Sequence, residues 1–208
     1  MGAPNRGLSF TGGNPIRSTL DRLVSWVGLG IVAVMLAAGG LLTWASTFVA
    51  DQVDEQLSAQ AITMPVKEAM GGLSDEDVAA LKPFAGQQMK TGAQAKAYAD
   101  HYILAHMNEA SGGKSYAEVS NAQRAACSEN ADSAECAELT ELKASQFQGS
   151  TLRGLLLYGY AFWMIGKIAG YAAIAAFVSA ALFIVLALLG FRSAAKHETA
   201  KPETGDAA

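Results

Sequence analysis

The longest apolar run in the chain, residues 152–191, constrains the fold more than any other feature. It contains no proline and only two charges, Arg153 and Lys167. An α-helix crosses a bilayer core of roughly 30 Å with about 20 apolar residues, because each residue adds ~1.5 Å. The run is therefore about twice as long as one crossing needs. We predict a transmembrane helix over residues 171–191 and a separate outer-interface helix over residues 151–170.

A second apolar run, residues 23–50, carries no charge over its full length. A cleavable signal peptide is the alternative, but its apolar region would span only about 7–15 residues. We therefore predict a retained transmembrane helix. Aromatic rings prefer the membrane interface, and lysine side chains can reach it from inside. We expect such anchors near the ends of the two spans: Trp26, Trp44, Tyr158, Tyr160, Trp163 and Lys167.

The segment between the two runs, residues 51–150, is polar and acidic, with fifteen Asp and Glu against seven Lys and Arg. It lacks the basic face that nucleic acid requires, which argues against nucleic acid as a partner. No stretch alternates polar and apolar residues for long enough to form a strand. The pairs Ser74–Asp77 and Ser115–Glu118 each predict the start of a short helix, and residues 91–110 predict a longer one. The predicted fold class is all-α, with a small extracytoplasmic helical domain between two transmembrane helices.

Basic residues predict which side of the membrane each segment occupies. They flank both runs towards the chain termini, at Arg6, Arg17, Arg22, Arg192, Lys196 and Lys201. Cytoplasmic flanks carry the excess of lysine and arginine. We therefore expect a disordered cytoplasmic tail over residues 1–22, a second cytoplasmic tail over residues 192–208, and a multi-pass protein of the cell membrane. A third crossing within residues 152–170 is the alternative, and it would place the C-terminus outside.

Cys127 and Cys136 are the only cysteines, and they flank a short polar loop. In an oxidising compartment such a pair normally forms a disulfide, which agrees with the predicted outward placement. The chain-entropy relation gives the bridge a stabilising effect of about 2–3 kcal/mol. Two unrelated thiols are the alternative. Zinc binding is disfavoured because the spacing is wide and no histidine lies nearby in the sequence.

No pattern in the chain indicates catalysis, a metal or a cofactor. His101 and His106 lie five residues apart, about 140° around a helix, whereas a shared metal needs a spacing of three or four. We expect ordinary surface or hydrogen-bonded histidines. The acids of residues 75–77 suit a helix N-terminus better than a calcium loop. Nucleophile, phosphate-loop and zinc-protease motifs do not occur, so we predict a protein that is not an enzyme.

Small residues in the second run predict close packing against another helix. Gly166 and Gly170 form a G-x-x-x-G step, and Ala173 and Ala180 continue nearly the same face. Phe177 interrupts that face, so we expect close approach only in its outer half. We favour packing within one chain over a dimer, with the facing surface supplied by Gly30, Ala33, Ala37 and Gly40 of the first run.

The predicted outer-interface helix has an apolar face of its own. Its members recur at helical spacing, as Leu155, Tyr158, Phe162 and Ile165. We expect this helix to continue into the final span. Because a solvated helix would not expose these side chains together, we expect the face to pack on the outer domain or on lipid head groups.

Three segments resemble those of a known family: DQVDEQLSAQAITMP at residues 51–65, AKAYADHYILAHMNEASGGKSYAEVS at residues 95–120, and residues 149–191. Together, over roughly residues 20–192, the chain resembles small actinobacterial membrane proteins of unknown function. The resemblance implies two transmembrane helices. Members are often labelled aromatic ring-opening dioxygenases. That label fails here because an iron site needs histidines and a carboxylate, and the only histidines are His101, His106 and His197.

Two classes of function fit these features. The first is a non-enzymatic accessory or scaffold subunit of the cell envelope, with the lipid bilayer and other membrane proteins, or a second copy, as partners. The alternative is an extracytoplasmic ligand sensor or regulator, although the short tails offer no effector domain. A membrane-surface enzyme is disfavoured. A channel would require an oligomer, because no ionisable residue lies deep in either predicted span.

Overall fold

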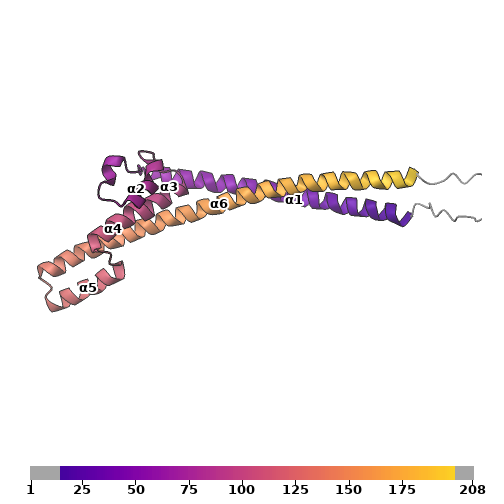
Figure 1. Cartoon of the computed structure of the whole chain (residues 1–208). Helices are drawn as coiled ribbons and strands as arrows, with labels where there is room; N and C mark the ends of the chain where they lie inside the picture. Colours follow the sequence, from indigo (N-terminus) through magenta and orange to yellow (C-terminus); the bar gives the residue numbers. More distant parts are fainter. Residues whose placement is uncertain (1–14, 200–208) are drawn as a thin grey trace, which may run out of the picture. The chain divides into compact units, whose positions relative to one another are not determined.

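The structure is a computed structural model that describes residues 15–199, with side chains described for residues 19–196 (Figure 1). It is all-helical, at 85% helix, and its described part contains no strand, which confirms the all-α prediction. The helices in chain order are α1 (Pro15–Ala59), α2 (Asp75–Leu81), α3 (Gly92–Tyr98), α4 (Leu104–Ser111), α5 (Tyr116–Glu129) and α6 (Ala134–Thr199). Short 3-10 segments η1 (Lys67–Met70) and η2 (Lys82–Phe84) flank α2, and a π-helical turn η3 (Ala99–Ile103) joins α3 to α4.

Helices α1 and α6 are both long and apolar enough to cross a membrane, as the sequence predicts. The α6 helix has 66 residues and includes the predicted outer-interface helix, which is therefore helical and continuous with the final span. Helix α1 extends to Ala59, beyond the predicted span that ends at residue 50. It begins at Pro15, so part of the predicted disordered tail is helical. Proline suits a first helical position because its fixed φ is preorganised and its missing N–H is not needed there. Residues 1–14 and 200–208 of the predicted tails lie outside the described residues.

The chain divides into two compact units, which we describe separately. The hairpin unit contains residues 15–43 of α1 and residues 171–199 of α6. The head unit contains residues 44–170, and with them the rest of both long helices.

In the hairpin unit, the buried residues of each long helix recur every seven positions. On α1 they are Ser25, Val32 and Gly39, and on α6 they are Ala173, Ala180, Ala187 and Ala194. A strict seven-residue repeat is the signature of two helices that wind around each other with a left-handed twist. Alanine at every buried position of α6 lets the two backbones approach closely.

The head unit has a conventional apolar core where the last turns of α1 meet α2, α3 and α6. Met64, Leu81, Met89, Ala95 and Leu156 are fully or almost fully buried there. A single antiparallel bridge between Thr63 and Gln88 ties the connection after α1 to the connection before α3.

Local sequence signals start the short helices of the head unit. The Ser74 side chain accepts a hydrogen bond from the Asp77 N–H, and Ser115 forms a full capping box with Glu118, both as predicted. A third capping box, between Thr91 and Gln94, begins α3. The helix predicted over residues 91–110 is present as α3 and α4, with the π-helical turn η3 between them.

Candidate functional site

The seam between α1 and α6 contains the residues that the sequence predicts for helix packing. Within the head unit, a Cβ added at Gly166 would lie 3.0 Å from Val49 Cγ1, and one at Gly170 would lie 2.9 Å from Ser46 Oγ. Ala173 and Ala180 are buried in the hairpin unit. These distances are shorter than ordinary contacts, so both glycines sit where a larger side chain would push the two helices apart.

The facing residues on α1 differ from the prediction. Gly30, Ala33, Ala37 and Gly40 are exposed, and a Cβ at Gly30 or Gly40 would meet nothing within 4 Å. Gly28 and Gly39 face α6 instead, with Ala187 and Phe177 as their neighbours. The buried α1 positions mix serine, valine and glycine, so a search for small residues alone selects the wrong side of the helix.

Phe177 does not end the close approach of the helices, contrary to the prediction. A Cβ added at Gly39 would lie 2.9 Å from two atoms of the Phe177 ring. The absence of a side chain at Gly39 therefore leaves the space into which the ring fits. Further along the same unit, a Cβ at Gly28 would touch the Ala187 Cβ at 3.7 Å, so the seam continues past the phenylalanine.

The predicted interface anchors fall into two groups. Exposed rings of α1 pair with phenylalanines: Trp44 stacks on Phe48 with centroids 5.6 Å apart, and Trp26 contacts Phe191 edge-on at 5.9 Å. On α6, the Lys167 ammonium lies 5.2 Å from the Trp163 ring centroid. Tyr160 is half-buried beside Trp163, whereas Tyr158 is among the most exposed apolar side chains of the chain.

An ion-pair cluster holds η3 against α6 in the head unit. The Arg153 guanidinium donates a hydrogen bond to Asp100 at 2.8 Å, and Lys96 pairs with the same carboxylate. Burial raises the pKa of Asp100, but its hydrogen bonds to the two cations and their charges outweigh burial and leave the pKa below its ordinary value. Because these residues lie up to 57 positions apart, sequence spacing gives no signal for the cluster.

The two histidines make separate hydrogen bonds, as expected for non-ligand histidines. His101 Nδ1 lies 2.9 Å from an Asp77 carboxylate oxygen, and His106 Nδ1 donates to the Tyr102 carbonyl at 2.7 Å. The hydrogen bond from the Ser74 hydroxyl lowers the pKa of Asp77, burial opposes this, and the hydrogen bond and charge of His101 lower the pKa further. Within residues 15–199, no three His, Cys, Asp or Glu side chains lie close enough together to hold a metal ion.

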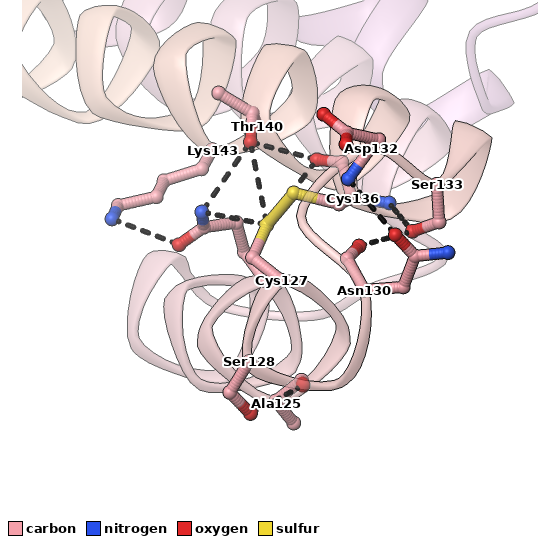
Figure 2. Close-up of a disulfide and its surroundings, with 10 residues drawn as sticks. Ala125, Cys127, Ser128, Asn130, Asp132, Ser133, Cys136, Thr140 and Lys143 are labelled. Carbon is pink, nitrogen blue, oxygen red and sulfur yellow. Dashed lines mark hydrogen bonds between the residues drawn. A yellow bond between two sulfur atoms is a disulfide. The ribbon is translucent and has the colours of Figure 1, made fainter.

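Cys127 and Cys136 form a disulfide that joins the end of α5 to the start of α6, in agreement with the prediction (Figure 2). Polar contacts reinforce the junction. Gln123 donates to the Thr140 hydroxyl at 3.3 Å, and Lys143 donates to the Gln123 side-chain oxygen at 3.3 Å. At the other end of α5, the Tyr116 ring lies 5.9 Å from the Phe147 ring. Helix α5 therefore covers one side of α6 from Cys136 to Phe147.

A groove of about 320 Å³ lies between the α3–α4 segment and α6. Stacked rings of Tyr98 and Tyr102 form one wall, with centroids 4.9 Å apart, and His106 lies at its edge. Burial raises the pKa of Tyr98. The wall includes residues of the π-helical turn, a feature that is frequent at functional sites.

The apolar face of α6 that the sequence identifies is uncovered. Leu155, Tyr158, Phe162 and Ile165 are 60%, 68%, 58% and 58% exposed. No part of the chain between Pro15 and Thr199 packs over them, so of the two predicted covers the outer domain is wrong, and the lipid head groups stay a prediction. We call these four residues the free face. Within the head unit, α1 packs on one side of α6 through Leu57 and Val49, and η3 packs on another through Asp100.

The contacts between α1 and α6 show which charged residues of α1 lie at the same level as the free face. Gly166 lies opposite Val49, and Gly159 lies opposite Leu57. Between these two contacts α1 carries Asp51, Asp54 and Glu55, all exposed. Ionised carboxylates are costly in a hydrocarbon core. The segment of α6 at the same level, which includes Phe162, therefore cannot lie in hydrocarbon while those acids are charged.

Comparison of the chain with protein-family models, curated proteins and solved structures finds no match.

Proposed function

We propose that this protein is a non-enzymatic membrane accessory or scaffold subunit that binds membrane proteins through the free face of α6. In this proposal α1 and α6 cross the cell membrane, both termini are cytoplasmic, and the head unit lies outside. The observation that carries the proposal is the exposure of four large apolar side chains, two of which, Phe162 and Ile165, lie at the level of three exposed acidic residues of α1.

Water, hydrocarbon and lipid head groups are the other environments that this face could meet. Exposure of this face to water is unfavourable, because contiguous exposed apolar patches on soluble surfaces mark interaction sites. Hydrocarbon is excluded by the carboxylates of Asp51 and Asp54 at the same level. Lipid head groups could cover Ile165, which is the residue of the free face nearest the predicted span. Leu155 lies ten residues before Ile165, about 15 Å further from that span along the helix axis. A protein surface can cover all four residues.

A photoreactive phenylalanine analogue at position 162 tests the proposal in native membranes. Leu182 is the matched control, because it is also an apolar, 61% exposed residue of α6 and lies well inside the predicted span. We expect position 162 to give a defined protein adduct and position 182 to give mainly lipid adducts. Lipid adducts alone at both positions would show that the free face is a membrane surface and not a protein interface.

Ligand sensing is a second candidate function, and the groove beside Tyr98, Tyr102 and His106 favours it. A sensor would bind a small molecule with these aromatic side chains and change the contact of η3 with α6. Tyr102→Ala should then abolish ligand protection of the α3–α4 segment in hydrogen exchange without unfolding the head unit. Equal exchange with and without every tested metabolite would count against sensing.

A further inference from the structure

We propose that the protein bound on the free face is a second copy of this chain, with the two α6 helices side by side and parallel. This inference rests on the proposed function, since it requires that the free face binds protein. It names the partner and the geometry of the contact, which that proposal leaves open.

The residues of the free face have the spacing of a helix-pairing surface. Its four residues follow one another at intervals of three, four and three, and Ala169 continues the series after four more. This alternation is the seven-residue repeat with which two helices wind around each other. The hairpin unit uses the same repeat where α1 packs on α6. Lipid requires no such repeat, because any evenly apolar surface satisfies it.

The orientation of two copies in one membrane and the charges near the free face both permit a parallel pair. Two copies inserted in one membrane point the same way, so a two-fold axis along the membrane normal aligns their α6 helices in parallel and in register. Each residue of the free face then meets its own counterpart, and any charge there would meet a like charge. Residues 147–169 contain only Arg153 and Lys167 as charges. Both are engaged within the head unit, by Asp100 and by the Trp163 ring.

The free face is continuous with a packing surface within the chain. Tyr158 and Ile165 lie eleven and eighteen residues after Phe147, close to three and five full turns, so all three point to the same side of α6. Helix α5 lies along the start of α6 (Figure 1), and its Tyr116 ring contacts Phe147, which is itself 58% exposed. The free face is the continuation of this helix-binding side beyond the contact with α5.

The area is sufficient for a specific contact. Large apolar side chains bury roughly 150–250 Å² each when fully covered. At the observed exposures, the four residues of each copy would contribute roughly 500 Å², or about 1,000 Å² for the pair, which reaches the lower bound of specific interfaces. Homodimer contacts are also more apolar than other interfaces, as this one would be.

Cysteine crosslinking of the full-length protein in its membrane tests the parallel pair. Ile165→Cys places a thiol on the free face, and Ile168→Cys is the matched control, because Ile168 is also an isoleucine of α6 and is 60% exposed. In a parallel pair, position 165 meets its counterpart within the 4.4–6.8 Å that a disulfide spans between Cα atoms, whereas position 168 lies to one side. The unaltered chain, with its cysteines already joined, gives the background.

We expect mild oxidation to convert Ile165→Cys to a covalent dimer several-fold more than Ile168→Cys, with two differently tagged unaltered chains co-purifying from one membrane. Equal crosslinking at both positions would reflect random collision and would overturn the inference. If the photoreactive group at position 162 captures a different protein and no second copy, the inference fails while the proposed function stands. If that group captures only lipid, both fail.

Discussion

Gly92 lies at the tightest contact between the short helices and α6, and its replacement by alanine tests how the head unit is assembled. A Cβ at this position would lie 2.5 Å from Trp163 Cβ, 2.8 Å from Trp163 Cγ and 3.0 Å from Tyr160 Cα. These atoms belong to the root of a side chain and to the backbone, so they cannot move aside as a flexible side-chain end could.

The size of the effect follows from these distances. Ordinary contacts begin near 3.4 Å, so α3 would have to move away from α6 by about 1 Å, and such overpacking costs about 1–3 kcal/mol. Alanine also favours a helix over glycine by up to about 1 kcal/mol. Gly154→Ala isolates that gain, because it makes the same change within α6, where an added Cβ would meet nothing within 4 Å. Because both variants have this gain, it cancels, and we expect them to differ by the overpacking cost of about 1–3 kcal/mol.

Thermal unfolding of both variants in lipid nanodiscs, followed by far-UV circular dichroism, measures this difference. Since 1 kcal/mol shifts Tm by about 2–4 °C for chains of this size, we expect Gly92→Ala to melt roughly 2–12 °C below Gly154→Ala. Hydrogen exchange should show the loss in α3 and η3. A Tm for Gly92→Ala equal to or above that of Gly154→Ala would refute the packing of α3 on α6 described above.

Three further predictions concern other contacts. Reduction of the Cys127–Cys136 disulfide should lower the stability of the packing of α5 on α6 by about 2–3 kcal/mol. Hydrogen exchange should then be faster in α5 and unchanged in the final span, and equal rates in α5 before and after reduction would contradict this. Because the folded pKa of Asp100 is lowered, its stabilising effect is present at neutral pH and lost as the pH falls below about 4. The Asp100→Asn variant should therefore show a flatter acid-unfolding profile than the unaltered chain, and identical profiles would contradict the role of the ion pairs. Gly39→Ala should destabilise the helix pair by about 1–3 kcal/mol, and Phe177→Ala in the same chain should remove most of that penalty; additive losses would contradict their direct contact.

The sequence was sufficient for features that depend on local pattern. Run length and charge predicted two long apolar helices, and capping pairs predicted the starts of α2 and α5. The small residues Gly166 and Gly170 predicted one side of the helix seam, because a small side chain at regular spacing is itself visible in the sequence.

Features that depend on long-range partners were not predictable. The facing side of α1 was assigned wrongly because Gly39 and Gly40 are adjacent and equally small, and only Phe177 of α6 distinguishes them. The contact of Arg153 with Asp100 joins residues 53 positions apart. The free face was recognised as apolar, but the sequence could not show that η3 and α1 pack on other sides of α6 and leave it uncovered.

Accessibility of single introduced cysteines in intact cells tests the central claim most directly, namely that the head unit lies outside a membrane crossed by α1 and α6. Asp54→Cys probes the level of the free face, Leu36→Cys probes the middle of the first span, and Arg192→Cys probes the opposite end of α6. A membrane-impermeant maleimide should label position 54 on intact cells, position 192 only after permeabilisation, and position 36 under neither condition. Labelling of position 192 on intact cells, or of position 54 only after permeabilisation, would contradict the account.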